Sequence, residues 1–287
     1  MIPPMLTFAR LTIWEAARRK LLIAIALLTL VIIAGTGWGF TKIAGVSADG
    51  QPPSPVEVRL VASQLLTLVA FLFSGVLALS AVLVAAPSVS SDIETNLALA
   101  MLARPVRRAD YLLGKWVGLG VLVVGYAAVS GALEMLVVAW ATGYVPPHPL
   151  QLVAFIAAEG LVLLTVALLF STRLAGMTGG IIALVLWFIA WIGGILEGIG
   201  RAFDNGTLTN VGLATRLIIP TDALWRGAVY ALEPATVIAA ARQAGRVASA
   251  TPFVVTDPIQ PAMLAWIAVW VTGILVLAVW SLRVREV

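Results

Sequence analysis

Six apolar blocks, each about twenty residues long or longer, constrain this chain more than any other feature of its sequence. A helix rises about 1.5 Å per residue, so each block is long enough to cross the roughly 30 Å hydrocarbon core of a bilayer. Because backbone polar groups in lipid must bond within the protein, blocks of this length favour helices over barrel strands. We predict an all-α integral membrane protein with six transmembrane helices, at roughly residues 21–40, 56–87, 111–142, 150–170, 176–198 and 263–282.

The composition agrees with a lipid environment. Hydrophobic residues make up 61% of the 287 residues and charged residues 11%, too few polar side chains to cover a soluble globule. The net charge of +4 comes from basic residues that border apolar blocks, so we expect the lipid bilayer, and no nucleic acid, as a partner. The absence of cysteine excludes disulfides, thiolate metal ligands and cysteine nucleophiles.

The distribution of Lys and Arg predicts the orientation of the spans. With the N-terminus in the cytoplasm, eleven of the 18 Lys and Arg residues fall on the cytoplasmic side and seven on the other. Positively charged flanks are retained in the cytoplasm. We therefore expect a multi-pass protein with both termini cytoplasmic.

Two stretches outside the spans have helical patterns of their own. Residues 3–20 mix apolar and basic side chains around Trp14, which predicts an amphipathic elbow helix lying in the membrane interface. Residues 199–261 are only moderately apolar, and Thr221 and Asp222 after Pro220 are possible N-caps. We expect this loop to form external or re-entrant helices within a single membrane domain that covers the whole chain.

The charged break between the second and third spans has the pattern of a short helix. Ser91 and Glu94 form a capping-box pattern, which predicts that a helix begins there. Pro105 disfavours helical geometry at Arg104, so the helix should last about three turns. A capped helix with an apolar face suits docking into a groove on another protein, but the same pattern also fits a connector lying on the membrane surface.

This segment, SDIETNLALAMLARPVRRADYLLGKWVGL, resembles the permease subunits of type-2 ABC transporters in its acid-rich helix, its L-A-R-P break and its Y-L-L-G-K re-entry. The six-span layout and the elbow agree with that resemblance along almost the whole chain. The sequence differs from the family pattern at Thr95-Asn96, where relatives often have Gly-Thr. The later segment LIIPTDALWRGAVYALEP also resembles the external segment before the last span in this family, which includes the permease that serves maturation of nitrous oxide reductase.

The resemblance implies a prokaryotic cytoplasmic membrane, export and a coupling helix at residues 91–105 that docks on a separate cytoplasmic ABC ATPase. It also implies that a second permease copy or a sibling chain completes the pore, and that ATP and magnesium belong to the ATPase. The coupling role falls by position on Asp92, Ile93, Glu94, Leu102, Arg104 and Pro105.

The sequence lacks the motifs of catalysis. No G-x-x-x-x-G-K-[ST] loop is present, so we expect no ATP hydrolysis, no catalytic residue and no cofactor in this chain. The lone histidine, His148, lies between prolines in a short turn, and we expect no metal site.

Glu134 and Glu159 are acids inside apolar blocks, where a carboxylate is costly unless it faces protein or water. Both lie roughly 13–15 Å from the turn at residues 144–149, on neighbouring helices. One hypothesis places them on a translocation pathway, and the alternative gives each a structural hydrogen bond to Ser, Thr or Trp.

Two other functions remain open on the residues alone. An ion-coupled secondary transporter would use Glu134 and Glu159 as its relay, although the chain lacks a second homologous half. A non-transporting membrane anchor would use residues 91–110 to recruit a cytoplasmic partner.

Overall fold

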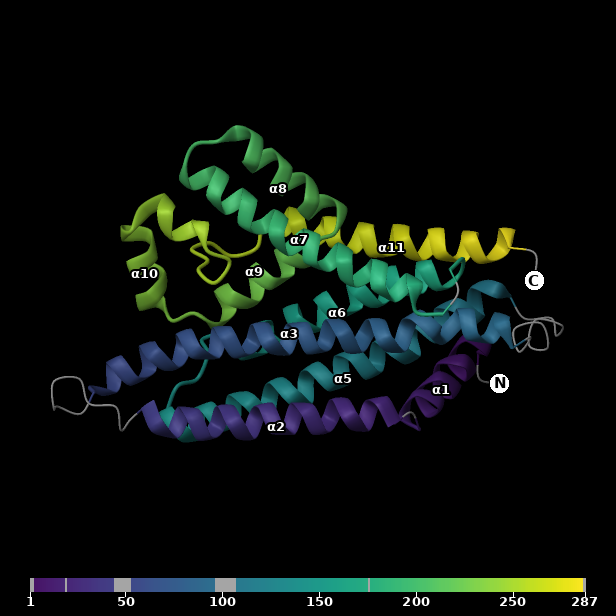
Figure 1. Ribbon diagram of the computed structural model, residues 1–287, viewed down its shortest axis with the longest axis horizontal. Coiled ribbons are helices and arrows are strands. Elements are labelled where there is room, and N and C mark those ends of the chain that lie inside the picture. Colours follow the sequence, from purple (N-terminus) through teal and green to yellow (C-terminus); the bar gives the residue numbers. More distant parts are fainter. Residues whose placement is uncertain (1–2, 19, 44–52, 96–106, 175, 286–287) are drawn as a thin grey trace.

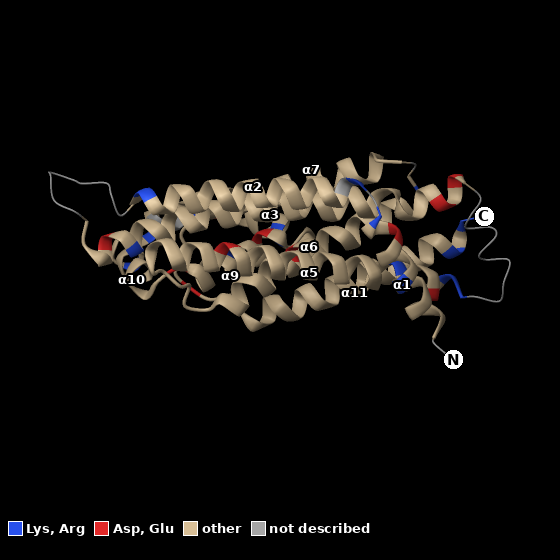
Figure 2. Ribbon diagram, turned by 90° about the horizontal axis from the view of Figure 1, so that it is seen from below, with Lys and Arg blue, Asp and Glu red and all other residues tan. Residues whose placement is uncertain are grey.

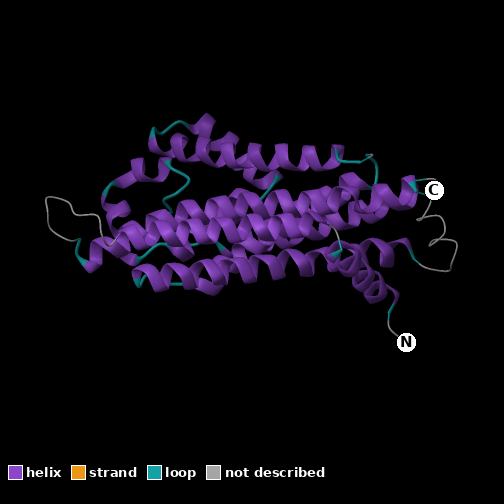
Figure 3. Cartoon of the chain, turned by 60° about the horizontal axis from the view of Figure 1, so that its bottom comes forward, coloured by secondary structure: helices purple, strands orange, loops and turns teal. Residues whose placement is uncertain are grey.

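The computed structural model describes residues 3–18, 20–43, 53–95, 107–174 and 176–285. Within these ranges the chain is helical and contains no strand (Figure 3). Six of the described helices are long and apolar enough to cross a membrane, which confirms the predicted fold class: α2 (Lys20–Ile43), α3 (Pro55–Glu94), α5 (Arg108–Thr142), α6 (Pro149–Ser171), α7 (Thr178–Ala202) and α11 (Pro261–Val284).

The shorter helices lie in the two stretches that the sequence singled out. The first stretch holds α1 (Pro4–Ala17), and its placement in the membrane interface stays a prediction. The long loop before the last span holds α8 (Gly206–Ile218), α9 (Thr221–Leu232), α10 (Ala235–Gln243) and the 3₁₀ helix η1 (Gly245–Ala250).

The helices form an elongated bundle with both termini at one end, which we call the terminal end, and α10 at the other, the distal end (Figure 1). Helix α6 lies in the middle and packs against α3, α5, α7, α9 and α11. Charged residues gather mostly toward the two ends, and a smaller group of both signs lies in the middle of the bundle (Figure 2).

Local signals explain several helix boundaries. The hydroxyl of Ser54 accepts a hydrogen bond from the backbone of Glu57 at 3.3 Å, and the Glu57 carboxylate accepts one in return at 2.7 Å, so a capping box starts α3. At the end of α5, Gly143 adopts a φ of 68°, a left-handed conformation that glycine tolerates best.

The structure corrects the predicted boundary after the second span. The capping box at Ser91 and Glu94 is wrong, because α3 continues through Pro87 and these residues form its last turn. Proline inside a helix normally removes a backbone bond. Just beyond the proline, the Ser171 hydroxyl of α6 accepts from the backbone N–H groups of Val89 and Ser90, both at 3.1 Å, and so ties this part of α3 to α6.

Helix α1 packs closely on the first part of α5. A Cβ at Gly114 would lie 2.6 Å from the Met5 carbonyl oxygen, and one at Gly118 would lie 2.6 Å from the Ala9 carbonyl oxygen. This Gly-x-x-x-Gly spacing lets two helix backbones meet directly. The glycines therefore fix the position of α1 across the terminal end of the bundle.

Helix α8 runs back along α7 in the antiparallel direction. Three contacts define the register: Gly200 meets Thr209, Gly212 meets Glu197, and Gly193 meets Thr215. The turn between α8 and α9 therefore lies beside the middle of α7 and not beyond its end (Figure 1).

Candidate functional site

A buried polar cluster joins the last turn of α3 to the start of α5. Lys115 Nζ lies 2.5 Å from Asp92 Oδ2, and the Tyr111 hydroxyl donates to the same oxygen at 2.6 Å. Lys115 also donates to the Ser88 carbonyl oxygen. Because Asp92 and Lys115 are only 8% and 4% exposed, each charge depends on the other. We call these four residues the junction cluster.

The other residues expected to couple the chain to a partner lie at or beyond this end of α3. Ile93 packs partly into the hydrophobic core, whereas Glu94 is exposed and accepts a hydrogen bond from the Gly176 backbone at 3.2 Å. Leu102, Arg104 and Pro105 lie outside the described residues.

Arginines join three helix ends beside the junction cluster. Arg108 at the start of α5 donates to the carbonyl oxygens of Leu282 and Arg285, at 2.7 and 2.8 Å. Arg285 donates to the Thr172 carbonyl at 2.6 Å, and Arg173 donates to the Ser281 hydroxyl at 2.9 Å. The terminal ends of α5, α6 and α11 are therefore held together, as the ends of α1, α3 and α5 are.

Glu159 lies in the centre of the bundle with both carboxylate oxygens bonded. Ser74 of α3 donates to Oε2 at 2.7 Å, and the indole N–H of Trp187 of α7 donates to Oε1 at 2.7 Å. The side chain is fully enclosed by protein, with 3% of the residue exposed. Glu159 thus connects three helices.

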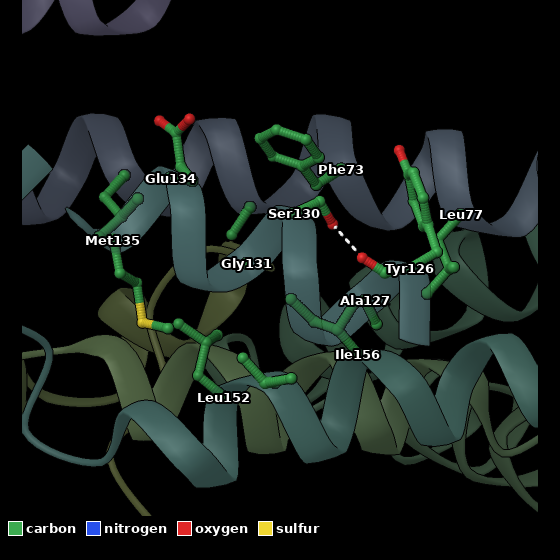
Figure 4. Close-up of a pocket in the computed structure, with 13 residues that line it drawn as sticks. Phe73, Leu77, Tyr126, Ala127, Ser130, Gly131, Glu134, Met135, Leu152 and Ile156 are labelled. Carbon is green, nitrogen blue, oxygen red and sulfur yellow. Dashed lines mark hydrogen bonds between the residues drawn. The ribbon is translucent and has the colours of Figure 1, made fainter. Parts of the chain in front are cut away.

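Glu134 of α5 is equally buried, at 3% exposure, but is bonded less completely. Thr36 of α2 donates to Oε2 at 3.1 Å, and Oε1 has no partner among the described residues. Glu134 borders a cavity of about 30 Å³ between α3, α5 and α6. Figure 4 shows its carboxylate pointing away from Leu152 and Ile156 on the far side of that cavity.

The two carboxylates share no hydrogen-bonding partner. Both accept the Ser, Thr or Trp hydrogen bonds that the structural hypothesis expects. Across the described ranges no group of three or more His, Cys, Asp or Glu side chains is placed to hold a metal ion.

A network of buried charges between α7, α8 and α9 was not predicted from the sequence. Arg216 lies 2.5 Å from Glu197 and 3.0 Å from Asp222. Arg226 also pairs with Asp222 at 3.0 Å and donates to the Gly194 carbonyl at 2.6 Å. Arg201 pairs with Glu197 on the more exposed side. Burial lowers the pKa of Arg216, although the carboxylate of Asp222 opposes that shift.

One signal could have revealed this network. The criterion that selected Glu134 and Glu159, an acid within an apolar block, applies equally to Glu197. The arginines that pair with Glu197 lie in the loop of residues 199–261. The rule that predicts membrane orientation counts such arginines only as positive charges near the end of a span. From the sequence, Asp222 is only a possible helix N-cap, and its pairing with Arg216 and Arg226 is not visible.

Another buried acid, Glu233, directly follows the last residue of α9. It is 1% exposed, and one of its oxygens lies 3.5 Å from the Val255 backbone nitrogen while the other has no partner among the described residues. Burial raises the pKa of Glu233 to about 7. The Tyr144 hydroxyl donates to the adjacent Leu232 carbonyl, so this corner of α9 is held against the α5–α6 turn.

A family model described as ABC-2 family transporter protein matches residues 13–287. The chain belongs to this family. The match includes all six candidate spans, the junction cluster and the α7–α9 charge network. No curated protein matches the chain. Family membership makes the chain a multi-pass membrane permease component of an ABC transporter, distinct from the ATPase component.

Proposed function

We propose that this chain is the permease subunit of an ATP-driven exporter, and that a separate ABC ATPase docks on its cytoplasmic terminal end. The chain's place in the ABC-2 family supports a permease. The sequence resemblance at residues 91–105 supports the docking surface. In this proposal two permease chains, identical or siblings, form the translocation pathway, in a prokaryotic cytoplasmic membrane.

The junction cluster is the observation that carries the proposal. A docking segment drives transport only if its movement reaches the spans. Asp92, in the described part of this segment, bonds to Lys115 and Tyr111 of α5. Helix α1 packs against Gly114 and Gly118 of the same α5. A force applied beyond Thr95 would therefore act on α3, α5 and α1 together.

Within this proposal the six residues have different roles. Glu94 is exposed and would contact the ATPase, and the resemblance assigns the same role to Leu102, Arg104 and Pro105 by sequence position. Asp92 points inward and acts on α5, so it is a positioning residue. Ile93 anchors the turn in the core.

Reconstitution with an ABC ATPase from the same genome tests the proposal. Glu94→Arg should weaken both copurification of the ATPase and stimulation of ATP hydrolysis by about tenfold, because a reversed charge at an interface costs a kcal/mol or more. Asp257→Arg reverses an exposed acid in the loop after η1, outside the proposed docking segment, and is the matched control. The proposal fails if the native chain retains no ATPase, or if both variants behave alike.

Glu134 and Glu159 remain candidates for the translocation pathway. The unpartnered oxygen of Glu134 beside a cavity favours a polar path there more than the fully bonded Glu159 does. We expect Glu134→Gln to reduce transport while stability is retained, and Glu159→Gln to lower stability. If Glu134→Gln leaves both transport and stability unchanged, that residue is not on the pathway.

A further inference from the structure

A groove of about 350 Å³ lies between α2, α3 and α5, with a residue of α6 contributing to its wall. Its lining is almost entirely apolar, and Ser80 and Tyr126 supply the only side-chain hydroxyls among its lining residues. The rim on α5 is open, because Val121 and Val129 are 54% and 62% exposed and no atom lies within 4 Å of where a Cβ of Gly125 would be.

The length of the groove matches one leaflet of a bilayer. On α5 its lining runs from Leu119 to Val129, which at helical rise is about 15 Å, half of the roughly 30 Å hydrocarbon core. The groove is limited on the distal side by contact between α2 and α5, where the Thr29 hydroxyl and the Tyr126 hydroxyl lie 2.5 Å apart.

The terminal end of the groove lies near the level expected for lipid headgroups. Trp14 is 62% exposed and Arg18 stacks over its ring at 3.6 Å, a pairing typical of the membrane interface. Lys20 begins α2, and Leu22, only two residues later, already lines the groove. Two basic residues, Arg18 and Lys20, therefore lie within four residues of Leu22, the first groove-lining residue along the chain.

A small polar pocket continues the groove in the same direction. It shares Val84 and Leu119 with the groove and is also lined by Glu15, Ser88 and Lys115. The site as a whole is amphipathic, with one apolar wall and charged groups at a single end. An amphiphile with one chain in the groove fits this arrangement, whereas a helix of a second protein, about 10–12 Å across, is a poor match for a channel between three helices.

We propose that the groove holds one acyl chain of a resident membrane phospholipid whose phosphate lies beside Arg18 and Lys20. The chain fills the gap between α2 and the α3–α5 pair in one leaflet. The bound lipid thereby connects the elbow region to the first spans. This site requires only that the protein spans a membrane and is independent of any ATPase.

Native mass spectrometry tests the site by counting the phospholipids retained by the full-length protein in detergent. Phosphatidylglycerol or phosphatidylethanolamine is added at equal amounts. We expect one phospholipid to be retained per chain. Gly125→Leu projects a side chain into the groove without meeting protein atoms and should reduce retention by about tenfold. Gly273→Leu on α11 is the matched control, because its Cβ also meets nothing and it lies outside the groove.

Two further experiments test where the phosphate and the acyl chain of the lipid lie. Arg18→Ala with Lys20→Ala should weaken retention of both lipids by about tenfold or more, since each basic residue near a phosphate contributes about 1 kcal/mol. The chain has no native cysteine, so a fluorophore on Ser80→Cys reports from the groove and one on Val269→Cys from exposed α11. One equivalent of phospholipid with a nitroxide on the acyl chain should quench the first and not the second.

Three outcomes would overturn the proposal. These are no retained lipid in the native chain, equal retention by Gly125→Leu and Gly273→Leu, or equal quenching at both labelled positions. Disulfide-linked dimers formed through Gly125→Cys would instead identify a second copy of the chain as the occupant.

Discussion

Glu233 is a buried acid outside the candidate spans whose charge changes near neutral pH. Because burial raises its pKa to about 7 from 4.5, the folded state binds more protons than the unfolded state between those values. Its contribution to stability is therefore complete below about pH 4.5 and is lost as the pH rises to about 7.

Glu233→Gln should remove this pH dependence. We expect the variant to be more stable than the native chain by about 1–3 kcal/mol above pH 7, and to differ less below pH 5. Thermal unfolding in detergent from pH 5 to 8.5 measures the difference. Parallel pH profiles for the two proteins would show that Glu233 does not titrate in this range.

The junction cluster offers a second test of single residues. Removal of one member of a buried ion pair leaves the other charge uncompensated, so Asp92→Asn and Lys115→Met should each destabilise the protein by about 2–5 kcal/mol. The double variant should lose less unfolding free energy than the sum of the losses in the two single variants. A double-mutant cycle on unfolding free energies measures this coupling, and a value near zero would argue against a direct interaction.

At the level of helices, the packing of α1 depends on having no side chain at Gly118. Gly118→Leu should displace α1 and cost about 1–3 kcal/mol, because its Cβ would lie 2.6 Å from the Ala9 carbonyl. Gly273→Leu, on α11 in open space and outside the groove, is the control. Increased proteolysis after α1 in the first variant alone is the expected result.

Apolar length made the spans predictable from the sequence. The predicted end of the third span at residue 142, just before the turn at residues 144–149, agrees with the end of α5 at Thr142. The end of α3 was not predictable, because the bonds that tie the turn after Pro87 to α6 come from Ser171, 84 positions later in the chain. The position of α8 was not predictable either. The glycines of α7 indicate that another helix can pack closely against it, but they do not identify that helix.

The candidate site was predictable in part. An acid in an apolar block is visible in any sequence, and this identified Glu134 and Glu159. The partner of each acid was not visible, because Thr36 and Ser74 lie on helices whose rotation is set by the whole bundle. The same limit applies to Asp92, which the resemblance placed at a docking surface and which the fold turns toward Lys115.

For the whole molecule, the positions of the charges predict the topology. Both termini lie at one end of the bundle, and we expect this end to face the cytoplasm (Figure 1). Single cysteines at Thr95 and Asp257 report on the segment after α3 and on the loop before α11. A membrane-impermeant maleimide applied to intact cells should label Asp257→Cys and leave Thr95→Cys unlabelled until the cells are opened; the reverse pattern would invert the topology.

The proline in α3 divides this 40-residue helix into two unequal arms. Asp92 lies five residues beyond Pro87, about 7.5 Å along the short arm, so a rotation of about 10° there would move it by roughly 1.3 Å. Its bonds to Tyr111 and Lys115, at 2.6 and 2.5 Å, would then exceed the usual hydrogen-bond limit. We therefore expect the junction cluster to resist bending of the short arm away from α5 unless α5 turns with it.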